Sequence, residues 1–293
     1  MSEIETLVAA ELAEAVDSSV TEMAAAIAVR HGSAARAMLF YGSCLRQREL
    51  KGLMLDFYLI VSDYDEAYDK AWLATANRLI PPNVFPFAHG DLAAKYAVLS
   101  EADFVALNRA DARTVSVWAR FAQPSRLVWV HSATARAHVI ASIAQSGVTL
   151  FSLAAPIAPD QTPVAIWRAG FANTYRAELR AERTDRSASI VDADPDRYVR
   201  FGAAILAEHP EIRVGNRRLI ERRWSHLRRN GKLITILRLA KASLTFSGGI
   251  DYLAWKINRH AGTHIAIKPW QRRWPLLGAI VLVPKLFAKG AVR

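Results

Sequence analysis

Cysteine, targeting signals and long apolar runs are scarce in this sequence. Its 293 residues include one cysteine, Cys44, which rules out an internal disulfide and fits a reducing compartment. The N-terminal residues Met-Ser-Glu-Ile-Glu are acidic, whereas a secretory signal begins with positive charge and a transit peptide is rich in arginine. The longest clean apolar run, Leu276 to Val283, is far shorter than the roughly 20 residues that cross a bilayer. These absences predict a cytoplasmic protein with no membrane-spanning helix.

Acidic residues are almost missing from the last quarter of the chain. Residues 217–293 carry 17 Lys and Arg against two acids, a net charge of +15, whereas residues 1–216 carry 21 basic and 25 acidic residues, a net charge of −4. The positive charge of the whole chain therefore belongs to its C-terminal segment. Such an asymmetry indicates a polyanionic partner for that segment: nucleic acid, an anionic bilayer or a phosphorylated lipid.

The sequence does contain enough apolar residues for a folded core. Hydrophobic residues make up 52% of the chain and charged residues 22%, a balance that excludes global disorder. The length exceeds the usual single domain of about 100–200 residues, and three prolines between residues 154 and 163 indicate a linker. We therefore predict an N-terminal domain over residues 1–150, a helical second domain over 151–216 and a basic segment over 217–293.

The order of the predicted elements is typical of an α/β domain followed by helices. Short apolar runs predict strands, and apolar residues at helical spacing predict helices. The predicted strands span residues 37–41, 53–61, 95–99 and 127–130. The predicted helices span residues 4–30, 65–79, 132–145, 164–209 and 217–241, and a capping box at Ser100 begins one more.

The first candidate site is a Gly-Ser turn between two predicted strands. Gly42-Ser43 follows the first strand, and Asp56 interrupts the apolar residues of the second. Backbone N–H groups and a hydroxyl in such a turn can bind nucleotide phosphates, and a carboxylate can hold the metal that neutralises charge in phosphoryl transfer. A carboxylate in an apolar strand is costly without a partner. The alternative is a structural aspartate whose oxygens accept backbone hydrogen bonds.

This arrangement resembles the polymerase-β-like nucleotidyltransferases. Within that class, Tyr41-Gly-Ser-Cys-Leu-Arg-Gln47 and Met54-Leu-Asp-Phe-Tyr-Leu-Ile-Val61 resemble the opening of the Tam41 family of phosphatidate cytidylyltransferases. The segment Ala94-Lys-Tyr-Ala-Val-Leu-Ser100 is similar to a further motif of that family. Weaker similarities follow at 117–124 and 174–182, so the matches run in order over residues 38–182.

The resemblance implies an enzyme that converts CTP and phosphatidic acid to CDP-diacylglycerol and pyrophosphate with Mg²⁺. It also implies an α/β nucleotidyltransferase domain followed by a mostly helical, winged-helix-like domain. Asp56, Lys95 and Glu178 would be the catalytic residues, with Asp56 and Glu178 as metal ligands and Lys95 neutralising phosphate charge. The residues that the resemblance assigns to nucleotide binding are Tyr41, Gly42, Ser43, Gln47 and Arg180.

Two of these residues have alternatives that the sequence leaves open. Lys95 could be a solvent-exposed lysine at a strand edge. Glu178 alternates with Arg176 and Arg180, a pattern that is also typical of an ion-paired, exposed helix face. In addition, Tyr58 stands where many nucleotidyltransferases have a second aspartate, so one expected metal ligand is missing from that strand.

The basic segment also holds four of the eight tryptophans, Trp224 among them. Tryptophan favours the membrane–water interface, and each Lys or Arg near anionic lipid contributes about 1 kcal/mol. We therefore predict that residues 217–293 bind a membrane. The predicted membrane-binding residues are Trp255, Trp270, Arg272, Arg273 and Trp274. The alternatives are arginine pairs such as Arg217-Arg218 that bind nucleic-acid phosphates, or a solvated basic helix with ordinary buried tryptophans.

Together these features predict a cytoplasmic enzyme bound peripherally to the inner face of the membrane. Its predicted partners are CTP, phosphatidic acid and the anionic membrane surface, with Mg²⁺ as cofactor and no nucleic acid. The alternatives are a nucleotidyltransferase that acts on nucleic acid or another phosphorylated acceptor, and an inactive nucleotide-binding adaptor.

Overall fold

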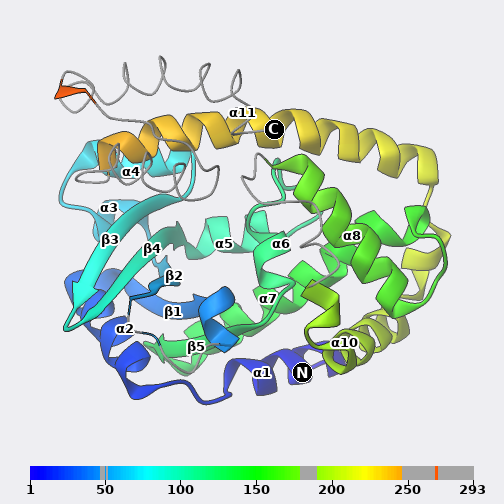
Figure 1. Ribbon diagram of the computed structural model, residues 1–293, viewed down its shortest axis with the longest axis horizontal. Helices are drawn as coiled ribbons and strands as arrows, with labels where there is room; N and C mark the ends of the chain where they lie inside the picture. Colours follow the sequence, from blue (N-terminus) through cyan, green and yellow to red (C-terminus); the bar gives the residue numbers. More distant parts are fainter. Residues whose placement is uncertain (47–49, 51, 179–189, 246–267, 270–293) are drawn as a thin grey trace.

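Five strands form one mixed sheet in the N-terminal half of the chain (Figure 1). The computed structural model describes all residues except 47–49, 51, 179–189, 246–267 and 270–293. The strand order is β3-β4-β2-β1-β5, with β2 and β4 parallel and all other neighbours antiparallel. The predicted α/β class is confirmed. The strands are β1 (Ala35–Tyr41), β2 (Met54–Val61), β3 (Asn83–His89), β4 (Leu92–Ser100) and β5 (Ser125–Val130).

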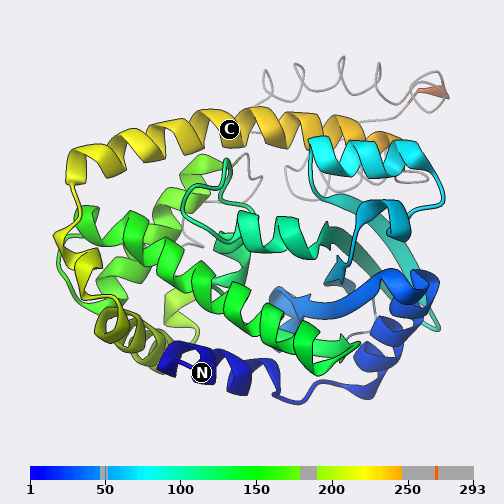
Figure 2. The same cartoon turned by 180° about the vertical axis from the view of Figure 1, so that it is seen from behind.

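Side chains alternate between the two faces of the sheet, and each face has its own apolar core. Phe40 and Phe57 lie on the face covered by α2 (Ser18–Arg30), α3 (Tyr64–Ala67) and α4 (Ala71–Leu79). Tyr41 and Tyr58 lie on the opposite face, which is covered by α5 (Glu101–Leu107), α6 (Trp118–Phe121) and α7 (Ala133–Ala154), as Figure 2 shows from behind. Asp56 shares the Tyr58 face because the two residues are two positions apart in β2.

A group of helices continues the second core beyond the sheet. Helices α1 (Glu3–Leu12), α8 (Pro163–Ala177) and α10 (Pro195–Glu208) pack around α7, and all four contribute to one buried cluster. The 3₁₀ helices are η1 (Gly32–Ala34), η2 (Ser43–Arg46), η3 (Ala155–Ile157) and η4 (Pro210–Val214). The described part of 151–216 is mostly helical, and the boundary expected at residue 150 falls inside α7. The division into domains and the winged-helix-like arrangement stay predictions.

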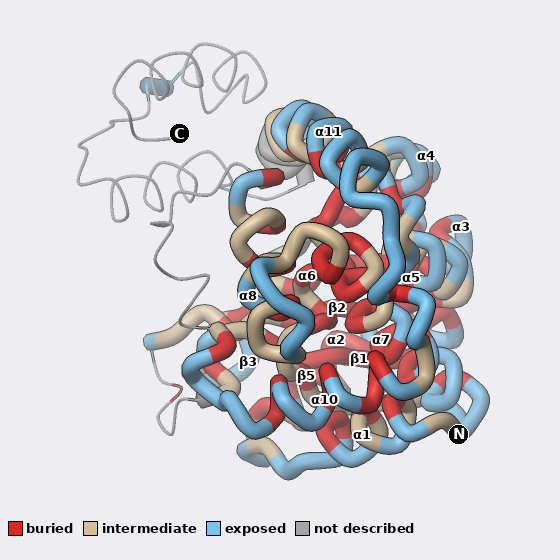
Figure 3. Tube along the Cα trace, turned by 90° about the vertical axis from the view of Figure 1, so that its right-hand side faces the viewer, coloured by how far each residue is buried: buried red, intermediate tan, exposed pale blue. Residues whose placement is uncertain are grey.

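Helix α11 (Arg217–Thr245) runs along one side of the molecule and joins the helical group to the sheet (Figures 1 and 3). Near its start, Trp224 is buried and donates from Nε1 to the carbonyl of Leu153 at 2.7 Å. Toward its end, Arg238 donates to the carbonyl of Pro81 at 2.7 Å, and Lys241 donates to the carbonyls of Ile80 and Pro82. A single helix therefore fixes the turn between α4 and β3 relative to α7.

The buried amine of Lys241 should make stability depend on pH. Burial, together with the charge of Arg238, lowers the pKa of Lys241 to about 7, whereas an unfolded lysine has a pKa near 10.4. Between these values the unfolded chain binds more protons than the folded chain, so the free energy of unfolding rises with pH. We expect a rise of about 1 kcal/mol per pH unit between about pH 7 and 9, measured by urea denaturation.

A Lys241→Met variant should lose most of this slope, because methionine fills a similar volume without a titrating group. Lys232→Met is the matched control, since Lys232 is exposed on the same helix, and it should keep the wild-type slope. Equal slopes in Lys241→Met and the wild-type protein would contradict a low pKa for Lys241.

Several predicted elements differ from the structure in extent. The helix expected over 4–30 is broken between α1 and α2, where Asp17 caps α2 by accepting from the N–H of Ser19 at 2.9 Å. The helix expected over 65–79 is divided into α3 and α4. Strand β3 was not predicted. Helix α7 extends nine residues beyond the predicted end at 145, to Ala154, because its later turns are buried against α8 and α10.

One helical stretch of the described chain, Ala133–Ile157, is long and apolar enough to cross a membrane by length and composition. In its most apolar window, 67% of the residues are buried inside the protein. The core helix of a folded domain has the same composition, and α7 packs on β1, α1, α6 and α8. This stretch is therefore weak support for a membrane span.

Candidate functional site

The end of β1 brings a backbone turn against a carboxylate. Tyr41, the last residue of β1, is paired with Asp56 of β2. The next residue, Gly42, has a φ of 95°, a conformation that L side chains rarely adopt. A Cβ on residue 42 would also lie 3.2 Å from Oδ2 of Asp56. The backbone conformation therefore favours glycine here, and an added Cβ would make a tight contact with the carboxylate.

Lys95 lies directly opposite Asp56 on the neighbouring parallel strand. The register of β2 and β4 pairs the two residues, and Nζ of Lys95 lies 3.1 Å from Oδ1 of Asp56. β4 is flanked by β3 and β2, so Lys95 is not the strand-edge lysine of the alternative interpretation. The two side chains remain 26% and 22% exposed, which leaves this ion pair accessible to a ligand.

Asp56 lacks the hydrogen bonds that a structural aspartate would need. Its Oδ1 atom is buried and, within the described part of the chain, accepts no well-aligned hydrogen bond, although Lys95 lies close by. A buried carboxylate oxygen without hydrogen bonds is costly. This favours a ligand-binding aspartate over one that backbone donors satisfy.

Aromatic rings and an arginine border the ion pair on the α6 face of the sheet. The rings of Tyr41 and Tyr58 lie 5.3 Å apart, and Phe121 packs against both. Burial raises the pKa of both phenols, and the Asp56 charge acts in the same direction. The guanidinium of Arg120 lies over the Tyr41 ring, 4.8 Å from its centre.

Glu178 belongs to the same cluster, although it comes from the helical group. Helix α8 ends at Ala177, and Glu178 has extended backbone angles, so an ion-paired face of one continuous helix through residue 178 is wrong. Burial is the largest single influence on the pKa values of Tyr58, Arg120 and Arg238, and the Glu178 carboxylate raises all three. For Arg120 the surrounding groups together outweigh burial, so its pKa lies above the ordinary value. The structure thus brings Asp56, Lys95 and Glu178 to one region of the molecule.

The remaining predicted site residues divide into two groups. Ser43 is exposed at the start of η2, directly after Gly42. The others lie outside the described residues: Gln47, Arg180, Trp255, Trp270, Arg272, Arg273 and Trp274.

Two residues of the basic segment make contacts inside the protein that account for their presence without a membrane. Trp224 is buried with its ring 6.1 Å from that of Trp118, so its inclusion among interfacial tryptophans was wrong. Arg223 donates to the carbonyls of Ala110 and Ala112. It is therefore not free to pair with a nucleic-acid phosphate beside Arg222.

Two arginines of this region were not predicted as site residues. Arg120 lies within the sequence similarity at residues 117–124, which could have identified it. Arg238 is far from every motif in the sequence, and only the course of α11 brings it to Tyr58 and Glu178. Among the described residues, no three His, Cys, Asp or Glu side chains gather as a metal site.

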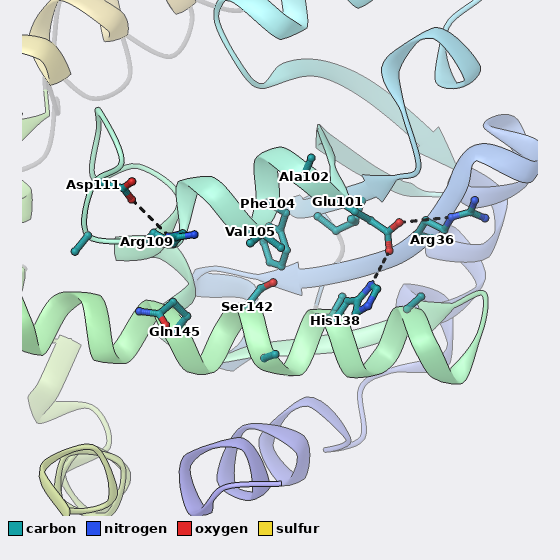
Figure 4. Close-up of a pocket in the computed structure, with 15 residues that line it drawn as sticks. Arg36, Glu101, Ala102, Phe104, Val105, Arg109, Asp111, His138, Ser142 and Gln145 are labelled. Carbon is teal, nitrogen blue, oxygen red and sulfur yellow. Dashed lines mark hydrogen bonds and ion pairs between the residues drawn. The ribbon is translucent and has the colours of Figure 1, made fainter. Parts of the chain in front are cut away.

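A separate hollow of the described surface lies away from this site. A groove of about 950 Å³ between α5 and α7 has Phe104 and Val139 in its lining, with Arg36 and His138 on either side of Glu101 (Figure 4). Arg36 and Tyr41 are near opposite ends of β1, roughly 16 Å apart at the usual rise of a strand. The groove therefore does not include the predicted site.

No model of a known protein family matches the chain, and no curated protein matches its sequence. A function for the site is therefore supported by its own residues and by the resemblance of its motifs alone.

Proposed function

We propose that this protein is a nucleotidyltransferase of the polymerase-β-like class that transfers the cytidylyl group of CTP to phosphatidic acid. The observation that carries the proposal is the position of Asp56 between the Gly42 turn and Lys95. Its Oδ1 atom is buried and accepts no well-aligned hydrogen bond within the described chain. Positive charge, backbone donors in a turn and a carboxylate are what a nucleoside triphosphate with its metal requires.

The residues at the site have separate roles in this reaction. The turn at Gly42-Ser43 would bind triphosphate oxygens, and Lys95 would neutralise phosphate charge. Asp56 and Glu178 would hold Mg²⁺, which commonly binds one or two carboxylates together with substrate phosphates. When bound, Mg²⁺ supplies charge neutralisation at the phosphates. Asp56 fits this role because Oδ1 accepts no hydrogen bond within the described chain.

The acceptor phosphate needs no strong general base. Phosphatidic acid is already ionised at neutral pH, so its oxygen can attack the α-phosphorus of CTP directly. The bond between the α-phosphorus and the oxygen that bridges to the β-phosphorus breaks, and pyrophosphate leaves with that oxygen and the bonding electrons. Most of the rate enhancement would come from positioning and from the fixed charges of Lys95 and its neighbours.

A lipid acceptor is supported by the exposed face of α11. Arg218, Arg222 and Arg229 are exposed there, and Leu233 and Leu237 continue the same face with 58% and 40% exposure. Cations beside exposed leucines suit the surface of an anionic membrane. We therefore propose peripheral binding to the inner face of the membrane, with residues 217–293 as the binding segment.

The direct test supplies labelled CTP and Mg²⁺ to the purified full chain. Vesicles of phosphatidylcholine with phosphatidic acid should yield pyrophosphate and a labelled CDP-lipid, and vesicles without phosphatidic acid should yield neither. ATP, GTP and UTP in place of CTP measure the base preference. The lipid product is resolved by thin-layer chromatography.

Two other outcomes would replace this proposal. Labelled RNA without labelled lipid would indicate a nucleotidyltransferase with a nucleic-acid acceptor. Tight CTP binding with no transfer to any phosphorylated acceptor would indicate an inactive nucleotide-binding adaptor. This outcome would agree with the presence of one carboxylate, Asp56, on a strand where many nucleotidyltransferases have two.

A further inference from the structure

Arg120 is held in a fixed place by the residues on either side of it. It belongs to the short helix α6, in which Trp118, Ala119 and Phe121 are all buried. These side chains fix the helix on the sheet, so the Arg120 guanidinium is placed over the Tyr41 ring. Tyr41 in turn precedes the Gly42 turn and is paired with Asp56.

The guanidinium of Arg120 has no acceptor in the described part of the chain. Its Nε atom is buried without a hydrogen-bond partner there, and no carboxylate there forms an ion pair with it. Three other buried or half-buried arginines differ in this respect. Arg197 donates to Glu11, Arg223 to the carbonyls of Ala110 and Ala112, and Arg238 to Pro81 and Ser116.

Its surroundings keep Arg120 charged despite its partial burial. Burial opposes the charge, but the phenols of Tyr41 and Tyr58 and the carboxylates of Asp56 and Glu178 raise the pKa of the guanidinium above its ordinary value. Among the described residues, Asp56 forms its ion pair with Lys95, whose Nζ lies 3.1 Å from Oδ1, and not with Arg120. A fixed guanidinium with unused donors is suited to two parallel hydrogen bonds with a phosphate.

We propose that Arg120 is a substrate-binding residue that donates hydrogen bonds to a phosphate group at the Asp56–Lys95 site. This inference rests on the proposed nucleotidyltransferase function and adds a residue from outside the sheet to its binding site. The phosphate can belong to the nucleotide or to the acceptor, and binding and kinetic measurements distinguish the two.

The test compares wild-type protein with Arg120→Met, Arg120→Lys and Arg113→Met. Arg113 is exposed ahead of α6, so its replacement is the matched control. Isothermal titration calorimetry measures the affinities for CTP and cytidine with Mg²⁺. Steady-state assays measure KM for CTP and for phosphatidic acid in phosphatidylcholine vesicles. Thermal melting of each variant reports on the fold.

If the nucleotide supplies the phosphate, Arg120→Met should weaken CTP binding by about 10- to 100-fold, the usual range for a charge-assisted hydrogen bond, and leave cytidine binding unchanged. If the acceptor supplies it, CTP affinity should stay constant and KM for phosphatidic acid should rise by a similar factor. In either case Arg120→Lys should recover part of the loss, since it keeps the charge but not the planar pair of donors.

Unchanged CTP affinity together with unchanged KM values in Arg120→Met would overturn the inference. Equal losses for CTP and cytidine with a lower melting temperature would overturn it too, because they indicate a structural arginine. Failure of the wild-type protein to bind any nucleotide would instead reject the proposed function, and the role of Arg120 with it.

Discussion

An Asp56→Asn protein should keep its fold and lose nucleotidyl transfer, with kcat falling by about 1,000-fold or more. Asparagine has nearly the same size and shape as aspartate, so the space beside Gly42 stays filled. The negative charge that would hold the metal disappears, and Lys95 loses its ion-pair partner. Rates of pyrophosphate release with saturating CTP and phosphatidic acid vesicles measure the loss.

The fold should tolerate this change because the Asp56–Lys95 pair is partly exposed. Such pairs contribute about 1 kcal/mol or less to stability, so the melting temperature should stay close to that of the wild-type protein. Asp111→Asn is the matched control, since Asp111 is 81% exposed and outside the site, and it should keep full activity. Wild-type turnover in Asp56→Asn would remove Asp56 from the mechanism, while unfolding of the variant would make Asp56 a structural residue.

Local sequence signals predicted the parts of this fold that depend on neighbouring residues. The apolar runs identified β1, β2, β4 and β5 within a few residues, and Ser100 does cap α5 by accepting from the N–H of Asp103. β3 was missed because its sequence Asn-Val-Phe-Pro-Phe-Ala-His contains a proline and mixed polarity. That segment is a strand through its antiparallel pairing with β4 at the edge of the sheet.

In the candidate site, too, local sequence signals predicted only the residues that lie close together in the chain. Asp56 and the Gly42 turn were predicted because they lie close in sequence, on adjacent strands. The direct pairing of Asp56 with Lys95 depends on the parallel register of β2 and β4. This register could not be predicted, because the two residues are far apart in the sequence. Arg238 approaches Glu178 only because α11 returns from the helical group to the sheet. Long-range packing of this kind leaves no periodic pattern in the chain.

Among the substitutions proposed for this protein, removal of the arginine of the buried Glu11–Arg197 pair should cause the largest loss of stability. This pair joins α1 to α10, its side chains are only 7% and 4% exposed, and Arg197 Nη2 donates to Glu11 Oε1 at 3.0 Å. Arg197→Met would leave the Glu11 carboxylate buried without its partner. We expect the free energy of unfolding to fall by about 3–5 kcal/mol, measured by urea denaturation.

We expect this loss to arise from the unpaired, buried carboxylate of Glu11 rather than from the lost contacts of Arg197. A second replacement distinguishes these two causes. The double variant Glu11→Leu with Arg197→Met should recover most of the lost stability, because two apolar side chains can pack where the ions were. Arg168→Met is the control, since the Arg168–Asp192 pair is about half exposed and should cost about 1 kcal/mol or less. If the double variant is as unstable as Arg197→Met alone, the arginine stabilises the protein through its stem and its contacts with the Tyr198 and Phe201 rings, and the ion pair itself contributes little.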